Sequence, residues 1–258
     1  MSIGTDMTGR IATEAAFWDK QVTEPKSFRQ RCYEAVNQEV WRQMLEMMGN
    51  VRGRRVLFVG CGTSFSLCRD LLERGADLWC LDVSSASIDQ LMRQPWGSSR
   101  RRLHLCVASA EDTGLPSGAF DVVVGKAILH HLDMKAFLPE LGRVAVAGAR
   151  IVFSEPLQGS PPLRLFRRLT PNHRVPSERP FRRTELAAIR AGCSEWTIRH
   201  NFLLATAAMP LMLAGLGRLG ERVFEAGLAG DRLVFSLIPP ARWWAWNVTF
   251  SGQLNGSI

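Results

Sequence analysis

Two glycines one residue apart follow a short uncharged run and could form the turn of a ligand cradle. Val56 to Gly60 contains only uncharged residues, several of them β-branched or aromatic, as a strand buried on both faces requires. Gly60 and Gly62 let the backbone turn tightly and approach a ligand, because neither has a Cβ in the way. Thr63 or Ser64 can then cap the helix that follows. This order of strand, glycine turn and helix N-terminus predicts a nucleotide-type cradle.

The next predicted strand runs from Asp77 to Leu81, and a carboxylate residue, Asp82, stands at its end. Asp82 lies 22 residues after Gly60, close to the ~20 residues that separate a glycine turn from an acid that binds ribose. A carboxylate suits this task because it only accepts hydrogen bonds, so two sugar hydroxyls can donate to it. The alternative is that Asp82 caps a helix predicted from Ser84 to Met92.

The residue three positions after the second glycine separates two classes of cofactor. A dinucleotide fingerprint has Gly or Ala there, whereas this chain has Phe65. Val56 to Ser64, VLFVGCGTS, instead resembles motif I of the class I S-adenosylmethionine (SAM) methyltransferases, commonly VLDVGCGTG. Phe58 stands where an acidic residue is usual, and Ser64 replaces the third glycine. A glycine turn of any βαβ unit is the alternative. The resemblance implies SAM as cofactor and S-adenosylhomocysteine (SAH) as product.

A later segment is similar to a second motif of the same family. After the predicted strand Leu103 to Val107, the chain resembles the family's GDAEDLPF segment, whose first acid holds the adenine amino group. Ser109 stands at that acid's position. Adenine recognition then falls to Glu111, Asp112 or the Ala110 amide. The resemblance implies a set of cofactor-binding residues along the chain: Gly60, Cys61, Gly62, Thr63, Asp82, Val83, Ser109, Ala110, Glu111 and Lys126.

Two histidines after the fourth predicted strand, Phe120 to Val124, are candidates for the chemistry. His130 and His131 lie in an LHHL segment similar to the family's segment after that strand. An imidazole has the intrinsic pKa of a general base, so one histidine is expected to accept a proton from the acceptor or hydrogen-bond to it. Adjacent residues are not expected to point inward together, and packing of the loop is the alternative role. Glu155, after the fifth predicted strand, completes the catalytic candidates.

The region after Glu155 is rich in proline and arginine, and it should overhang the crevice. The planar fork of arginine suits a carboxylate or phosphate, which indicates an anionic or amphiphilic acceptor. The alternative is a solvated charge run that pairs with Glu178 and Glu185. The residues expected to bind the acceptor are Trp18, from a helix that could close over the site, and Arg167, Arg168 and His173.

An apolar stretch, residues 202–217, carries no charge over sixteen residues and is interrupted by Pro210. It is shorter than the ~20 residues of a membrane-spanning helix. A cover over a greasy substrate, a contact with a membrane surface, a homodimer interface and plain core packing all fit this stretch.

Strands and helices alternate along the chain, which predicts an α/β fold. We expect a doubly wound, mostly parallel seven-stranded sheet of the Rossmann-like methyltransferase type, with N-terminal helices and an inserted C-terminal helical lid. Three parts are expected: a helical cap over 1–50, a SAM-binding core over 51–155, and completion of the sheet with lid insertions over 156–258. Because ligands bind beyond the carboxyl ends of the strands, the candidate residues should meet in one crevice.

Composition and charge exclude few classes of binding partner. The formal net charge of +8 is compatible with acidic substrates, membrane surfaces or nucleic acid and selects none of them. The six cysteines have no zinc-type spacing, so we expect reduced thiols in a cytoplasmic protein and no metal site. Met1 to Arg10 lacks the apolar run of a signal peptide.

The resemblance implies methyl transfer from SAM to a small molecule. We expect a natural-product, glycan or lipid-type acceptor, with O-methylation favoured. The alternative acceptor is RNA, which would make the protein an RNA methyltransferase. Against it, lysines are few and no RNA-binding appendage is recognisable. A protein that binds SAM without turning it over is the alternative from a different class.

Overall fold

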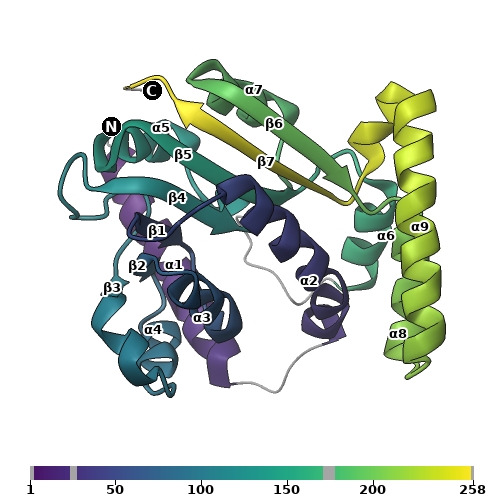
Figure 1. The fold of residues 1–258 in the computed structure, drawn as a ribbon, viewed down its shortest axis with the longest axis horizontal. Helices are drawn as coiled ribbons and strands as arrows, with labels where there is room; N and C mark the ends of the chain where they lie inside the picture. The colour runs from purple at the N-terminus through teal and green to yellow at the C-terminus, as the bar shows by residue number, and fades with distance from the viewer. Residues whose placement is uncertain (1–2, 24–27, 171–177, 257–258) are drawn as a thin grey trace.

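Seven strands form one sheet in the order β3-β2-β1-β4-β5-β7-β6, in which β7 runs antiparallel to both of its neighbours (Figure 1). The computed structural model describes residues 3–23, 28–170 and 178–256, and in the first two helices it describes side chains of residues 8–22 and 37–48. The strands are β1 (Arg55–Val59), β2 (Asp77–Asp82), β3 (Leu103–Val107), β4 (Phe120–Lys126), β5 (Ala145–Pro156), β6 (Cys193–Asn201) and β7 (Asn247–Leu254). The doubly wound, mostly parallel sheet expected from the sequence is confirmed.

Helices cover both faces of this sheet (Figure 1). The α-helices of the described residues are α1 (Ile3–Thr23), α2 (Phe28–Met48), α3 (Phe65–Glu73), α4 (Ser85–Met92), α5 (Met134–Val144), α6 (Pro161–Leu169), α7 (Arg183–Ala191), α8 (Met209–Leu213) and α9 (Gly217–Leu237). The N-terminal helices expected from the sequence are present: α1 packs against α4, and α2 packs against β5 and β7.

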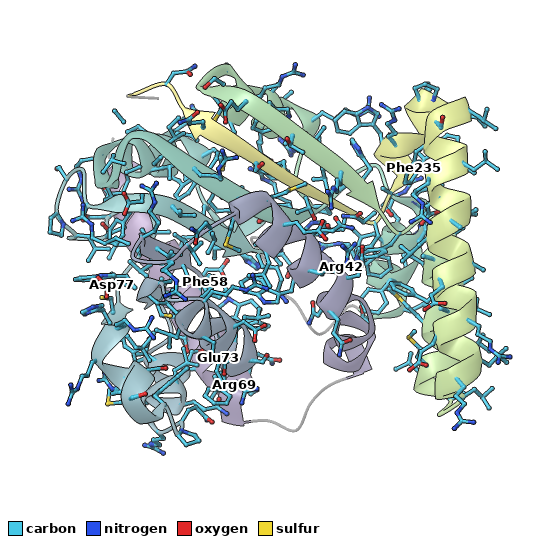
Figure 2. The ribbon with its side chains drawn as sticks, in the orientation of Figure 1. Arg42, Phe58, Arg69, Glu73, Asp77 and Phe235 are labelled. Atoms are coloured by element: carbon cyan, nitrogen blue, oxygen red, sulfur yellow. The ribbon has the colours of Figure 1, made fainter. Side chains whose placement is uncertain are left out.

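The central strand β1 is buried because its side chains alternate between two apolar layers. Val56 and Phe58 belong to the layer that contains residues of α2 and α3. Leu57 and Val59 belong to the layer on the other face. The Phe58 ring, labelled in Figure 2, stacks on Trp41 of α2 with 6.2 Å between the ring centroids. This stack gives a packing reason for an aromatic residue where the resembling family usually has an acid.

The apolar stretch 202–217 opens an insertion between β6 and β7. It leads into η3 (Ala205–Ala208), α8 and α9, and the two helices stand as a column at one side of the molecule beside α6 (Figure 1). Asp231 of α9 is buried and accepts hydrogen bonds from the N–H groups of Leu203 and Leu204, at 3.0 and 2.6 Å. This carboxylate therefore fastens the column to the end of β6. Among the described residues, no helix combines the length and apolar character needed to cross a membrane.

His200 of β6 lies among aromatic rings, which makes folding stability depend on pH. Burial, together with the charges of Arg242 and Arg183, lowers the pKa of His200 to about 4. Its ring centroid is 5.2 Å from that of Trp243 and 6.5 Å from that of Phe235. In the unfolded chain the same imidazole titrates near pH ~6.5. The stability that this residue contributes is therefore complete above that pH and is lost as the pH falls toward 4.

We expect His200 alone to lower the free energy of unfolding by about 1 kcal/mol between about pH 7.5 and pH 5.5. The variant His200→Phe keeps a ring in the aromatic cluster and should remove this part of the pH dependence. Urea unfolding of both proteins at the two pH values measures the difference. An identical pH dependence in the two proteins would contradict the assignment to His200.

Candidate functional site

A cavity of 270 Å³ opens at the carboxyl ends of the parallel strands, where doubly wound sheets bind their ligands. The loops after β1, β2, β3 and β4 line it, together with α1 and residues beside β7. The sequence-predicted residues that line it are Trp18, Gly60, Cys61, Gly62, Asp82, Val83, Ser109, Ala110, Glu111, Lys126, His130 and His131. The structure therefore brings together most of the candidates from distant parts of the chain.

The turn after β1 requires glycine at position 60. Gly60 has a φ of +63°, and a Cβ built there would lie 2.6 Å from the side chain of Ile128 in the loop after β4. The N–H groups of Gly60 and Cys61 donate to the Leu81 carbonyl, at 2.8 and 3.2 Å. The loops after β1 and β4 and the end of β2 are therefore packed against one another at the rim of the cavity.

Three residues of this turn occupy different surroundings. Cys61 lines the cavity and is buried, and burial raises the pKa of its thiol to about 11. Ser64 is the N-cap residue of α3 and lines the cavity, but its side chain makes no capping hydrogen bond to a described residue. Thr63 is exposed and is not part of the cavity lining.

Asp82 ties the glycine turn to the loop after β2. It is 8% exposed, and its carboxylate accepts hydrogen bonds from the Gly62 N–H at 2.7 Å and the Ser84 N–H at 2.9 Å. Burial raises the pKa of Asp82, and these two hydrogen bonds oppose the rise. The cap of α4 is Ser84, whose Oγ accepts a hydrogen bond from the Ser87 N–H at 3.0 Å. Asp82 thus lies on the cavity wall while another residue caps the helix.

Glu111, in the loop after β3, is buried and holds its neighbours in place. Its Oε1 accepts a hydrogen bond from the Asp133 N–H at 2.6 Å, and its Oε2 pairs with Arg10 of α1. The Ser109 hydroxyl accepts a hydrogen bond from the Glu111 N–H at 3.2 Å. Asp112 is exposed and does not line the cavity. Of the two acidic candidates in this loop, Glu111 is the one on the cavity wall.

Lys126 brings a half-buried side chain with an amine to the cavity at the end of β4. Its Nζ donates a hydrogen bond to Oδ1 of Asn37 of α2 at 2.9 Å. Burial lowers the pKa of Lys126 to about 8. The amine therefore stays largely protonated near neutral pH and can bind an anionic group.

Both histidines of the LHHL segment line the cavity, so the expectation that they would not point inward together is wrong. They lie in η2 (Leu129–His131), a 3₁₀ turn in which neighbouring side chains do not alternate as they do in a strand. His130 is 5% and His131 is 8% exposed, and their ring centroids lie 4.2 Å apart. Ala127, with a φ of +54°, turns the chain just before them.

Glu155 positions this turn from outside the cavity lining. Its Oε1 accepts hydrogen bonds from the N–H groups of Ile128 and Leu129, at 2.9 and 2.8 Å. Its Oε2 lies 2.7 Å from Nδ1 of His130. Burial and the neighbouring His131 lower the pKa of His130, and the Glu155 carboxylate opposes this shift. Because a carboxylate only accepts, the hydrogen of His130 lies on Nδ1.

The first helix, α1, is fastened to the cavity by side chains spaced four residues apart. Arg10 donates to the His131 carbonyl at 2.8 Å and pairs with Glu111. The Glu14 carboxylate lies 3.3 Å from Nδ1 of His131. Trp18 donates to Glu14 at 3.2 Å, and its ring centroid is 5.6 Å from that of His131. Sequence reasoning found Trp18 and missed Arg10 and Glu14, although this spacing places all three on one helical face.

The arginine-rich segment contributes an acidic residue, Glu178, to the cavity lining. Glu178 lines the cavity, and its Oε1 accepts a hydrogen bond from Arg167 at 2.6 Å. Arg168 is exposed, and neither arginine lines the cavity. His173 lies outside the described residues. Apolar side chains also line the cavity, among them Ile11, Ile128, Leu132, Phe202 and Trp246.

Comparison with known sequences points to one kind of domain. Residues 57–153 match the family model described as a methyltransferase domain. The aklanonic acid methyltransferase DauC of Streptomyces sp. (strain C5) is 26% identical over 148 residues, 54% of this chain and 67% of that protein. The O-methyltransferase rstn1 of Aspergillus nomiae is 26% identical over 157 residues, 60% of this chain and 66% of that protein. The tRNA U34 carboxymethyltransferase of Idiomarina loihiensis is 30% identical over 121 residues, 43% of this chain and 36% of that protein.

Solved structures share the fold at low sequence identity. Geranyl diphosphate C-methyltransferase from Streptomyces coelicolor A3(2) is 13% identical with a TM-score of 0.59, covering 92% of this chain and 87% of that chain. Phosphoethanolamine N-methyltransferase 2 from Haemonchus contortus is 13% identical with a TM-score of 0.61, covering 93% of this chain and 60% of that chain.

Proposed function

Because the chain belongs to the class I SAM-dependent methyltransferase family, we propose that it transfers the SAM methyl group to a hydroxyl oxygen of a small, natural-product-type acceptor. The observation that carries the proposal is one cavity that joins the Gly60 turn and Asp82 to His130 and His131. An aklanonic acid methyltransferase and an O-methyltransferase are among its relatives, which supports a small organic acceptor and attack by oxygen.

In this proposal the adenosyl part of SAM lies against the loops after β1, β2 and β3. Asp82 accepts hydrogen bonds from the ribose hydroxyls, since its carboxylate lies on the cavity wall at the end of β2. The segment from Ser109 to Glu111 faces the adenine. The backbone of the Gly60 turn lies against the methionine end, and the Lys126 amine binds the methionine carboxylate.

The acceptor lies at the other end of the cavity, against His130, His131 and Glu178, which we call the histidine corner. Apolar side chains share this cavity, so we propose an amphiphilic acceptor whose hydroxyl meets the corner. Arg168 is exposed outside the cavity lining and is proposed to meet an anionic part of the acceptor, whereas the Arg167 charge is paired with Glu178.

The transfer is an in-line displacement at the methyl carbon. A lone pair of the acceptor oxygen forms the new C–O bond while the C–S bond breaks. The electron pair of that bond stays on sulfur, which converts the sulfonium of SAM into the thioether of SAH. The hydroxyl proton leaves at the histidine corner. Alignment of oxygen, carbon and sulfur is expected to supply most of the acceleration, and α1 helps to exclude water.

Methyl transfer from SAM with a labelled methyl group tests this proposal. The acceptors to compare are hydroxylated aromatic natural products, a glycolipid and tRNA. We expect label on an oxygen of a small molecule, together with release of SAH. Label in tRNA would instead support the RNA alternative, and SAM binding without any labelled product would support a non-catalytic SAM-binding protein.

A further inference from the structure

The histidine corner contains two imidazoles and a carboxylate close enough to share one ion. Each of its residues offers a ligand atom, and these atoms all lie within 4.8 Å of one another. All three residues line the cavity, and both histidines are buried. We infer that His130, His131 and Glu178 bind a divalent transition-metal ion of the zinc type at the acceptor end of the cavity.

Both imidazoles are held by carboxylates in the way that metal-binding imidazoles are held in proteins. Glu155 Oε2 lies 2.7 Å from Nδ1 of His130, and the Glu14 carboxylate lies 3.3 Å from Nδ1 of His131. A carboxylate only accepts, so each Nδ1 carries the ring hydrogen and each Nε2 keeps the lone pair that a metal ion requires. Two elements far apart in the chain, α1 and β5, thus fix the orientation and the protonated nitrogen of the two imidazole ligands.

The donor set selects the kind of ion. Two imidazole nitrogens and one carboxylate oxygen suit Zn²⁺, Co²⁺, Mn²⁺ or Fe²⁺, whereas Mg²⁺ and Ca²⁺ prefer oxygen ligands alone. Arg167 holds the carboxylate ligand through its 2.6 Å hydrogen bond to Glu178 Oε1. Three protein ligands leave coordination positions open for a small molecule.

The role of this ion rests on the proposed function. The ion binds the acceptor hydroxyl oxygen and lowers the pKa of that hydroxyl, so the proton passes to water. The oxygen lone pair then forms the C–O bond with the SAM methyl carbon, and the C–S electron pair stays on sulfur as before. The histidines act as ligands in this reaction, and the metal ion undergoes no change of oxidation state.

Metal binding is measured on the full chain after treatment with a chelator, without SAM or acceptor. Equilibrium dialysis with Zn²⁺ and visible absorption with Co²⁺ are the two measurements. We expect about one ion per chain and the absorption of a Co²⁺ site with three protein ligands. An excess of Mg²⁺ should leave both signals unchanged.

Two variants and one control assign the site to the corner. Glu178→Gln weakens a ligand, and Glu14→Gln alters the carboxylate that holds His131, so each should lower Zn²⁺ affinity by about 10- to 100-fold. The control is His104→Gln, because His104 makes a similar pair with Asp77 at 3.0 Å but lies outside the cavity lining. It should keep wild-type Zn²⁺ affinity. Circular dichroism shows that each variant is folded.

The inference and the proposed function can fail separately. Equal Zn²⁺ affinity in wild type and Glu178→Gln, or no Co²⁺ absorption at millimolar Co²⁺, would overturn the metal site. Full methyl transfer by the chelator-treated protein would overturn the role of the ion and leave the proposed function standing. Zn²⁺ binding at the corner in a protein that binds no SAH would support the metal site and overturn the proposed function.

Discussion

Replacing Asp82 with alanine is expected to weaken the binding of SAM and SAH by about 10- to 100-fold. Hydrogen bonds to a charged group contribute roughly 1.5–3 kcal/mol, and about 1.4 kcal/mol corresponds to tenfold in affinity. The same carboxylate also accepts hydrogen bonds from the N–H groups of Gly62 and Ser84, at 2.7 and 2.9 Å. Its loss therefore removes the ribose contact and loosens the glycine turn. Calorimetric titration with SAH measures the change.

The matched control lies at the opposite end of the same strand. Asp77 begins β2, pairs with His104 at 3.0 Å and is not part of the cavity lining. Asp77→Ala should therefore leave the dissociation constant of SAH unchanged. Wild-type affinity in Asp82→Ala, or an equal loss in both variants, would rule out Asp82 as the ribose-binding residue.

Replacing Glu155 with glutamine should lower kcat for methyl transfer by about 100-fold or more while SAH affinity stays nearly constant. The glutamine oxygen can still accept hydrogen bonds from the N–H groups of Ile128 and Leu129, so the turn is kept. Its amide group, however, donates to Nδ1 of His130 and moves the ring hydrogen to Nε2. The histidine corner then loses a nitrogen lone pair at the acceptor end. Single-turnover transfer of a labelled methyl group measures the rate.

Two further variants separate this effect from loss of stability. Glu155→Ala leaves one buried and one half-buried backbone N–H group without their acceptor and should lower the free energy of unfolding by about 3 kcal/mol. Glu140→Gln is the control: Arg143 lowers the pKa of that carboxyl to about 2, and it lies outside the cavity lining. Its kcat should equal that of the wild type. A wild-type kcat in Glu155→Gln would show that Glu155 does not position a reacting group.

Local patterns were enough to predict the elements that position the site. The uncharged run before Gly60, the two glycines and the spacing to Asp82 are all features of neighbouring residues, and each falls on the cavity wall or leads to it. The sheet is confirmed because alternation of strands and helices leaves few other arrangements. The packing role of Phe58 could not be predicted from neighbouring residues, because its stacking partner Trp41 comes from α2.

Contacts between distant segments could not be predicted from the same patterns. Glu14 and His131 are separated by 117 residues, and only the docking of α1 brings them together. The expectation about the two histidines failed because it assumed alternation as in a strand, whereas the chain forms a 3₁₀ turn. For Arg167 the sequence left two roles open, contact with the acceptor or pairing with Glu178; the structure shows the pair and places the acid on the cavity wall. A charge run does not reveal which members are paired.

A crystal structure of the protein with SAH most directly tests the central claim that one cavity holds the sulfonium cofactor and presents its methyl group to the acceptor. We predict that the ribose hydroxyls donate to Asp82, that the adenine lies beside the loop after β3, and that the sulfur faces the histidine corner. The account would be contradicted if SAH were bound elsewhere, or if its sulfur pointed away from His130 and His131.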